Sequence, residues 1–165
     1  MKRSGSRSDV QQAAEEVMIA EFSRQLGREL AKATIPVGSQ KVTVDGFHRD
    51  DQRVTLAEAW AHVGKAKSAQ RNKVLGDMLK LAFVTCVLRR SYPDVQVESF
   101  LLFADATAAN VVNGSCWAAL AAKEFTISTQ VIRLSSDEIE LIREAQHKQD
   151  IRASEDDGDE TGLRP

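Results

Sequence analysis

The alternation of apolar and polar residues predicts helices and strands in an order typical of an α/β domain. A first helix is expected from Asp9, which can cap it, to about Leu30. Its apolar face repeats at helical spacing: Ala14, Val17, Met18, Phe22 and Leu26. Proline and glycine at 35–38 interrupt this pattern and leave room for a short strand. Two alternating runs follow, at 41–47 and 53–63, and the polar residues between them suit a hairpin loop.

The second half of the chain alternates long helical patterns with apolar strand patterns. The expected elements are a helix over about 68–90, a strand over 95–104, a helix over 107–125, a strand over 129–134 and a helix from about 135 to 151. This order predicts the α/β class, with a mixed central β-sheet flanked by helices. We expect one domain over 9–151, between a disordered basic tail at 1–8 and a disordered acidic tail at 152–165.

Composition and charge favour a cytoplasmic protein with a polyanionic partner. The chain has 165 residues, of which 42% are hydrophobic, and no apolar run approaches the roughly 20 residues that span a bilayer. The basic start lacks the apolar stretch of a secretory signal, and two cysteines without metal-ligand spacing favour free thiols. Between residues 41 and 90, ten Lys and Arg residues outnumber five Asp and Glu residues. A basic middle segment is compatible with nucleic acid.

Two acidic residues lie inside the expected hairpin strands, where strand propensity does not favour carboxylates. Asp45 follows Val44, and Glu58 follows Ala57. If the strands pair across the loop, both carboxylates approach one another at one end of the sheet, and such a pair suggests a divalent-metal site. The alternative is that Asp45 begins a turn with Gly46 while Glu58 pairs with a nearby lysine.

The order of elements, with Asp45 and Glu58 on successive strands, resembles the PD-(D/E)XK nuclease superfamily over about residues 10–105. That superfamily includes RecB-like nucleases and many restriction enzymes. The resemblance implies a restriction-endonuclease-like core with an extra C-terminal α-β-α extension. It also implies that Asp45 and Glu58 hold Mg²⁺ or Mn²⁺, helped by the carbonyl of Ala59. The chain departs from the pattern at Trp60, where the family has its lysine, and no proline precedes Asp45.

A substitute for the missing lysine is sought among nearby polar residues. His62 shares strand parity with Glu58 and could point to the same site, although an ordinary strand-end histidine is the alternative. Further along, one helical stripe carries Gln70, Lys73, Asp77 and Lys80. The resemblance implies that Gln70 or Lys73, nearest the helix start, contributes to the active site. The alternative is a solvated, salt-bridging face.

Glu21 is a candidate third metal ligand on the first helix. Helical angles place it between Val17 and Met18 on the apolar side, and the resemblance implies an inward glutamate that completes the metal environment. The alternative is a helix-edge glutamate paired with Arg24 or Arg28.

Three functions remain open from the sequence. The first is a metal-dependent phosphodiester hydrolase acting on nucleic acid, with DNA expected. The second is a catalytically inactive nuclease-like domain that binds nucleic acid or a protein partner. The third is an assembly subunit, such as a homodimer, that associates through apolar helices like the one expected at 107–125.

Overall fold

The computed structural model describes the backbone of residues 7–156 and the side chains of residues 9–147. In chain order the elements are α1 (Arg7–Leu26), β1 (Ala31–Val37), β2 (Gln40–Arg49), β3 (Arg53–Trp60), α2 (Ser68–Ser91), β4 (Gln96–Phe103), α3 (Ala106–Ala109), α4 (Trp117–Glu124), β5 (Ile127–Val131) and α5 (Ser136–Asp156). The hairpin, the long helix α2 and the two strands that follow it confirm the predicted order.

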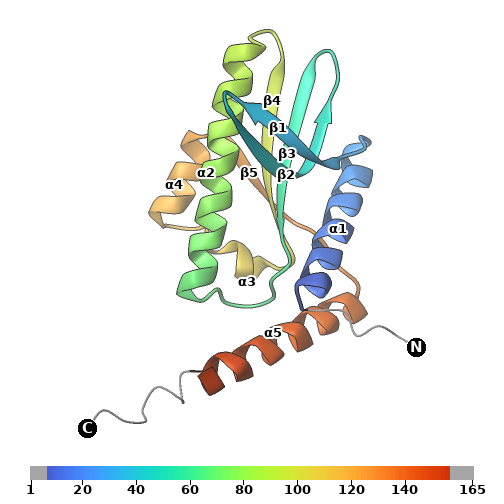
Figure 1. Ribbon diagram of the computed structural model, residues 1–165, viewed down its shortest axis with the longest axis vertical. Helices are drawn as coiled ribbons and strands as arrows, with labels where there is room; N and C mark the ends of the chain where they lie inside the picture. Colours follow the sequence, from blue (N-terminus) through green and yellow to red (C-terminus); the bar gives the residue numbers. More distant parts are fainter. Residues whose placement is uncertain (1–6, 157–165) are drawn as a thin grey trace.

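The five strands form one mixed sheet in the order β1-β2-β3-β4-β5. The pairs β1–β2 and β2–β3 are antiparallel, whereas β3–β4 and β4–β5 are parallel. Helices α1 and α2 lie on opposite sides of this sheet, and α5 runs across the end of α1 (Figure 1). The predicted α/β class with a mixed sheet between helices is confirmed.

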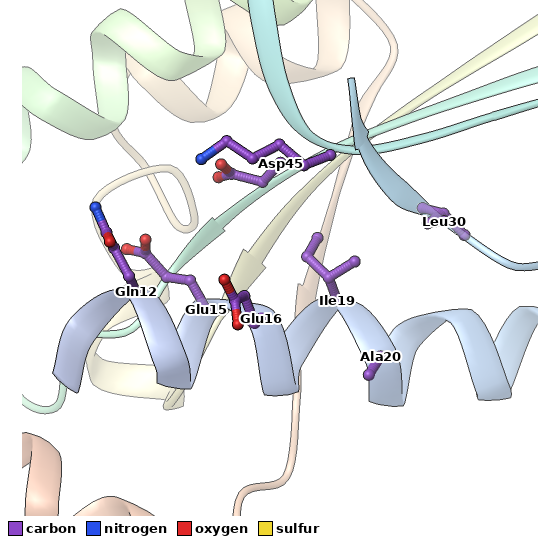
Figure 2. A pocket seen from close by; sticks show the side chains of 8 residues that line it. Gln12, Glu15, Glu16, Ile19, Ala20, Leu30 and Asp45 are labelled. Carbon is purple, nitrogen blue, oxygen red and sulfur yellow. The ribbon is translucent and has the colours of Figure 1, made fainter. Parts of the chain in front are cut away.

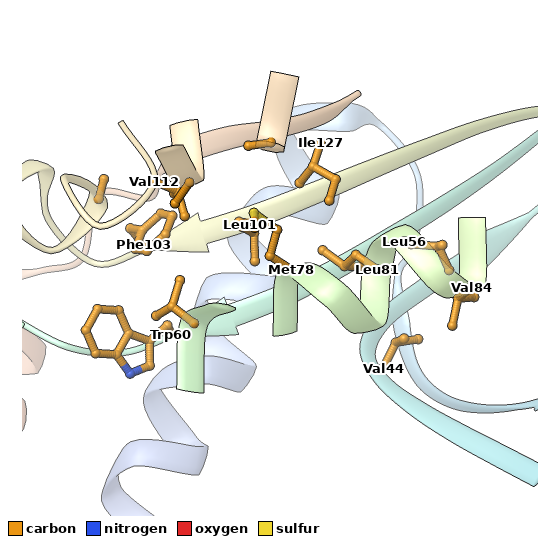
Figure 3. Close-up of a cluster of buried hydrophobic side chains, with 14 of the residues drawn as sticks. Val44, Leu56, Trp60, Met78, Leu81, Val84, Leu101, Phe103, Val112 and Ile127 are labelled. Carbon is orange, nitrogen blue, oxygen red and sulfur yellow. The ribbon is translucent and has the colours of Figure 1, made fainter. Parts of the chain in front are cut away.

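Each face of the sheet has its own apolar core. The side covered by α2, α3 and α4 buries residues such as Leu56, Leu81 and Phe103, which are fully buried (Figure 3). The side covered by α1 and α5 buries Met18 and Leu102, among others. Along β3 successive side chains therefore alternate between the two cores. Since every residue from Val54 to Trp60 is buried, β3 is the central strand that both layers share.

The first helix ends four residues earlier than the sequence pattern predicts. Gly27 follows Leu26 with a φ of 64°, a left-handed conformation that glycine adopts readily and that terminates helices. The predicted apolar face is also rotated, because Met18 is fully buried whereas Val17 is 39% exposed.

The helix predicted over 107–125 is wrong as a single element. It is divided into α3 and α4 by a turn that contains Gly114, whose φ is 83°. Asp105 caps α3, as its oxygen Oδ1 accepts from the backbone N–H of Ala108 at 2.7 Å. On α4 the side chain of Trp117 is exposed. Self-association through this region stays a prediction.

The last helix extends beyond its predicted end near 151. It continues to Asp156, so residues 152–156 are helical and do not belong to a tail. The remainder of the predicted acidic tail, and residues 1–6 of the predicted basic tail, lie outside the described residues. Within residues 7–156 no helix combines the length and apolar character needed to cross a membrane.

Candidate functional site

A β-bulge places Asp45 at the point where two strands separate. One residue of β1, Lys32, lies opposite two residues of β2, Asp45 and Gly46. A bulge of this kind bends its strand and redirects a side chain. The pairing of β2 with β3 ends at the same point, since its last pair is Gly46 with Ala57. Asp45 is therefore released from the ladder to β3 and its carboxylate can turn toward the opening between the strands.

The carboxylate of Asp45 is fixed to the neighbouring strand by one hydrogen bond. Its Oδ2 atom accepts from the backbone N–H of Ala59 at 3.1 Å. Because Ala59 directly follows Glu58 on β3, this contact places the Asp45 charge close enough to act on the Glu58 carboxyl. The contact also gives a hydrogen-bond partner to the backbone N–H of Ala59, which lies beyond the last pair between β2 and β3.

Glu58 is a buried acid with an incomplete set of partners. Only 3% of the residue is exposed, and its Oε2 atom lies 2.7 Å from Nζ of Lys80. Its Oε1 atom is buried and has no hydrogen-bond partner. Burial, with the neighbouring charges of Asp45 and Asp77, outweighs Lys80 and raises the pKa of the Glu58 carboxyl to about 8. The site therefore retains a buried oxygen that a further hydrogen-bond donor, a proton or a cation would satisfy.

A stripe of alternating charges on α2 faces this acid. Asp77 pairs with two lysines: its Oδ1 atom lies 3.2 Å from Nζ of Lys80, and its Oδ2 atom lies 3.3 Å from Nζ of Lys73. Burial opposes the charge of Lys80, but the hydrogen bond to Glu58 and the nearby carboxylates prevail, so the pKa of its ammonium is raised. Of the predicted stripe, Lys73, Asp77 and Lys80 share this network.

The inward acid on α1 is Glu15, not Glu21. Figure 2 shows the Glu15 side chain reaching from α1 toward Asp45 on β2. Burial raises the pKa of Glu15, and Asp45 acts in the same direction, against the effect of Lys73 from α2. Glu21 instead binds its own helix, with Arg24 at 2.6 Å and Gln25 at 3.0 Å. The expectation that Glu21 faces the site is corrected, and its pairing with Arg24 matches the alternative.

The sequence carried a signal for Glu15. It precedes Met18 by three residues and Ile19 by four, and both of these are buried. Residues at these spacings share one face of a helix, so Glu15 belongs to the inward stripe.

His62 and Trp60 lie against each other at the end of β3. Their rings are stacked, with centroids 4.6 Å apart and planes 9° apart, and Trp60 also meets the edge of Phe103. Nε2 of His62 lies 3.4 Å from the side-chain nitrogen of Gln146 on α5. Trp60 thus occupies the core, and His62 contacts both α5 and the tryptophan.

Gln70 is engaged at the start of α2. Its Oε1 atom accepts from the backbone N–H of Lys67 at 2.7 Å, an arrangement that belongs to a capping box. The side chain therefore satisfies the helix terminus, which differs from the contribution to the site expected from the resemblance.

A cleft opens beside Asp45, between α1 and the β1–β2 hairpin. It has a volume of about 320 Å³ and reaches from Gln12 and Glu16 on α1 to Lys32 and Asp45 on the strands (Figure 2). Ile19 and Leu30 contribute apolar surface to it. Within the part of the chain that the structure describes, no three His, Cys, Asp or Glu groups form a cluster that could hold a metal ion.

Two solved structures match this architecture. One is an XisH family protein from Nostoc punctiforme, with a TM-score of 0.54 and 11% identity over 76% of this chain and 94% of that one. The other is an fdxN element excision controlling factor protein from Anabaena variabilis, with a TM-score of 0.51 and 12% identity over 77% and 95% of the two chains. The chain shares its fold with XisH family proteins.

The likeness to the XisH structures concerns architecture: a five-stranded mixed sheet with helices on its two faces. Neither the family models nor the curated proteins contain a match to the sequence. The functional argument for this chain therefore depends on its own side chains around Asp45 and Glu58.

Proposed function

We propose that the chain is a metal-dependent phosphodiester hydrolase acting on nucleic acid, with a nuclease-like fold of the PD-(D/E)XK class. One observation carries the proposal: where β2 separates from β3, Asp45 accepts from the backbone N–H of the residue that follows the buried Glu58, and Oε1 of Glu58 has no hydrogen-bond partner. Burying an unpaired carboxylate oxygen costs free energy unless a cation or donor compensates it. A functional site is a common reason for retaining such a group.

The donor atoms at this position fit Mg²⁺ or Mn²⁺. Carboxylate and backbone carbonyl oxygens are the ligands that these hard cations prefer, and Mg²⁺ often uses only one or two carboxylates together with water. Asp45 and Glu58 would hold the ion, with the carbonyl of Ala59 nearby and Glu15 on the opposite side of Asp45. When bound, the ion would supply an activated water and offset charge that develops on the phosphate.

Lys80 supplies the cationic group that Trp60 cannot. Its ammonium is 2.7 Å from Glu58, and its side chain is 28% exposed, so it is held beside the acid pair without being sealed from solvent. An ammonium at this point would orient a phosphate oxygen and neutralise part of its charge. We therefore assign to Lys80 on α2 the role that the lysine of the (D/E)XK motif has on the strand.

DNA is the proposed polymer. One structural neighbour is described as controlling excision of the fdxN element, a description consistent with a nucleic-acid partner. The basic segment between residues 41 and 90, which includes β2, β3 and α2, would contact the phosphate backbone with little dependence on sequence.

The test is cleavage of labelled single- and double-stranded DNA and RNA in Mg²⁺, in Mn²⁺ and in chelator. The protein should cut DNA only with metal, and Asp45→Asn and Glu58→Gln should each abolish cutting while retaining the thermal unfolding transition. Glu21→Gln is the matched control, since it removes an acid on α1 that pairs with Arg24 of the same helix. Absence of cutting by the unmodified protein, or equal cutting by Glu58→Gln, would remove the proposal.

A second function, nucleic-acid binding without cleavage, is favoured by the contact between Lys80 and Glu58. The ammonium already compensates one oxygen of the acid, and Trp60 fills the position of the expected lysine. Under this alternative the protein shifts labelled DNA in chelator as well as in Mg²⁺, Glu58→Gln binds as tightly as the unmodified protein, and no product forms.

A further inference from the structure

The cleft beside Asp45 has the size and lining of a site for a single nucleotide. Its volume of about 320 Å³ is at the lower end of the range of about 300–1,000 Å³ for small-molecule pockets. A base-paired segment presents two strands and needs more room than this volume offers, which suits one unpaired nucleotide.

The lining of the cleft divides into an apolar part and a polar part. Ile19 from α1 and Leu30, just before β1, are both buried residues that contribute apolar surface. Gln12 and Glu16, one turn apart on α1, are exposed and offer hydrogen-bonding groups at the rim. Proteins that take a base out of its stack hold it between apolar side chains and read its edge with polar ones.

Lys32 gives the cleft a cationic end next to Asp45. It lies across the bulge from Asp45 and Gly46, so its position in the sheet is tied to that of Asp45. The other charged residues that line the cleft are the acids Glu15, Glu16 and Asp45. A phosphate entering here would be repelled by three carboxylates, so it would bind at the end where Lys32 lies.

We propose that this cleft binds one unpaired nucleotide, with its base against Ile19 and Leu30 and its phosphate at Lys32. This inference rests on the proposed function and specifies its substrate: a strand that is unpaired at the cleavage position, such as single-stranded DNA or the overhang of a duplex. A fully paired blunt duplex would have to unpair before it could reach Asp45, at a cost of a few kcal/mol.

The decisive variant fills the cleft without altering the acid pair. Ala20 is an exposed residue of α1 that lines the cleft, so Ala20→Trp would occupy it from the surface. Ala13→Trp is the matched control, because Ala13 is also an exposed alanine of α1 but lines a separate groove toward α5. We expect Ala20→Trp to lower kcat/KM on single-stranded DNA by about tenfold or more, and Ala13→Trp to leave it unchanged. Equal cutting by both variants would overturn the inference.

Charge in the cleft is tested with a pair of lysine variants in the same hairpin. Lys32→Gln should raise KM for single-stranded DNA and lower the slope of log affinity against log salt by about one. Lys41→Gln, in the exposed start of β2, should do neither. A salt slope that Lys32→Gln leaves unchanged would contradict the assignment of the phosphate.

Binding measurements separate failure of this inference from failure of the proposed function. Fluorescence anisotropy with labelled single-stranded and blunt duplex DNA, in Ca²⁺ or chelator, needs no cleavage. If the protein never cuts but binds single strands tighter, and Ala20→Trp weakens that binding by about tenfold, the nucleotide site stands without the hydrolase. If the protein cuts blunt duplex as fast as single strands, the nucleotide site is excluded while the hydrolase stands.

Discussion

Nζ of Lys80 lies 2.7 Å from Oε2 of Glu58, and this contact joins the middle of α2 to the C-terminal half of β3. The strand position at which the PD-(D/E)XK pattern has a lysine holds Trp60, whose ring is 5% exposed and stacked on His62. Glu58 faces the α2 side of the sheet, as do Leu56 and Trp60, and this is why a helical residue can reach it.

Lys80→Met should abolish most of the cleavage activity. The methionine keeps the aliphatic stem but removes the ammonium that would meet the phosphate, so kcat should fall by a factor on the order of 100 or more. Lys123→Met is the matched control, since Lys123 lies on α4 in a different part of the fold. Steady-state cleavage of a labelled oligonucleotide measures both variants. Retained activity in Lys80→Met would show that the ammonium serves only to hold Glu58.

Two glutamates on one helix give a matched pair for the metal site. Glu15 is half-buried and electrostatically coupled to Asp45, whereas Glu21 is held by Arg24 at the protein surface. Removing a group that supports a metal ligand typically costs 10–100-fold in affinity. We therefore expect Glu15→Gln to weaken Mn²⁺ binding by roughly tenfold, and Glu21→Gln to leave it unchanged. Isothermal titration with Mn²⁺ checks this, and equal affinities would exclude a role for Glu15.

Local sequence patterns predicted the order of strands and helices because each pattern has its own period. The placement of Asp45 and Glu58 on successive strands of a hairpin followed from the same reasoning. The turn that divides α3 from α4 was missed because its flanking residues are apolar and helix-compatible. Gly114, with its left-handed φ, lies in the turn between the two helices and is the residue that could have marked it.

The third acid and the cation could not be chosen from spacing alone. Glu15 and Glu21 both lie near the apolar face of α1, and the orientation of that face depends on how α1 packs on β2 and β3. Whether Lys73 or Lys80 meets Glu58 likewise depends on where α2 crosses β3, a tertiary relationship that a single helix does not encode.

Gly46 controls how closely α1 approaches the acid pair. A Cβ atom there would lie 3.0 Å from Cδ1 of Ile19, 3.1 Å from Cδ2 of Leu30 and 3.2 Å from Cβ of Ala57. Gly46→Ala should therefore lower the free energy of unfolding by about 1–3 kcal/mol and displace Ile19 and Leu30 in the cleft.

Replacing Gly76 on α2 with alanine should stabilise the protein, in contrast to the same change at Gly46. A Cβ atom there meets nothing within 4 Å, so Gly76→Ala should stabilise the exposed helix by about 0.5–1 kcal/mol. Urea unfolding of both variants gives the comparison. A Gly46→Ala protein as stable as the unmodified one would mean that the contact between α1 and the bulge is loose.

The raised pKa of Glu58 makes stability fall as pH rises. The folded protein keeps the Glu58 proton up to about pH 8, whereas the unfolded chain releases it near the ordinary value of 4.5. Between these values the folded state binds more protons, so the free energy of unfolding decreases with increasing pH in the absence of metal. Glu58→Gln cannot lose a proton, and its unfolding free energy should depend less steeply on pH over that range. Glu15 contributes in the same direction and remains in the variant, so the slope should be reduced without vanishing.

Glu21→Gln and added Mn²⁺ distinguish the titration of Glu58 from the titration of other acidic residues. The pKa of Glu21 is lowered to about 2, chiefly by its hydrogen bond to Arg24, so its contribution to stability is lost only as the pH falls below 4.5. Glu21→Gln should therefore leave the slope between pH 5 and 8 unchanged. Saturating Mn²⁺ should flatten that slope in the unmodified protein, because a cation at Oε1 favours the ionised carboxylate, and should have no such effect in Glu58→Gln. Urea unfolding across this pH range measures all three proteins, and identical slopes with and without Mn²⁺ would argue against a cation at Glu58.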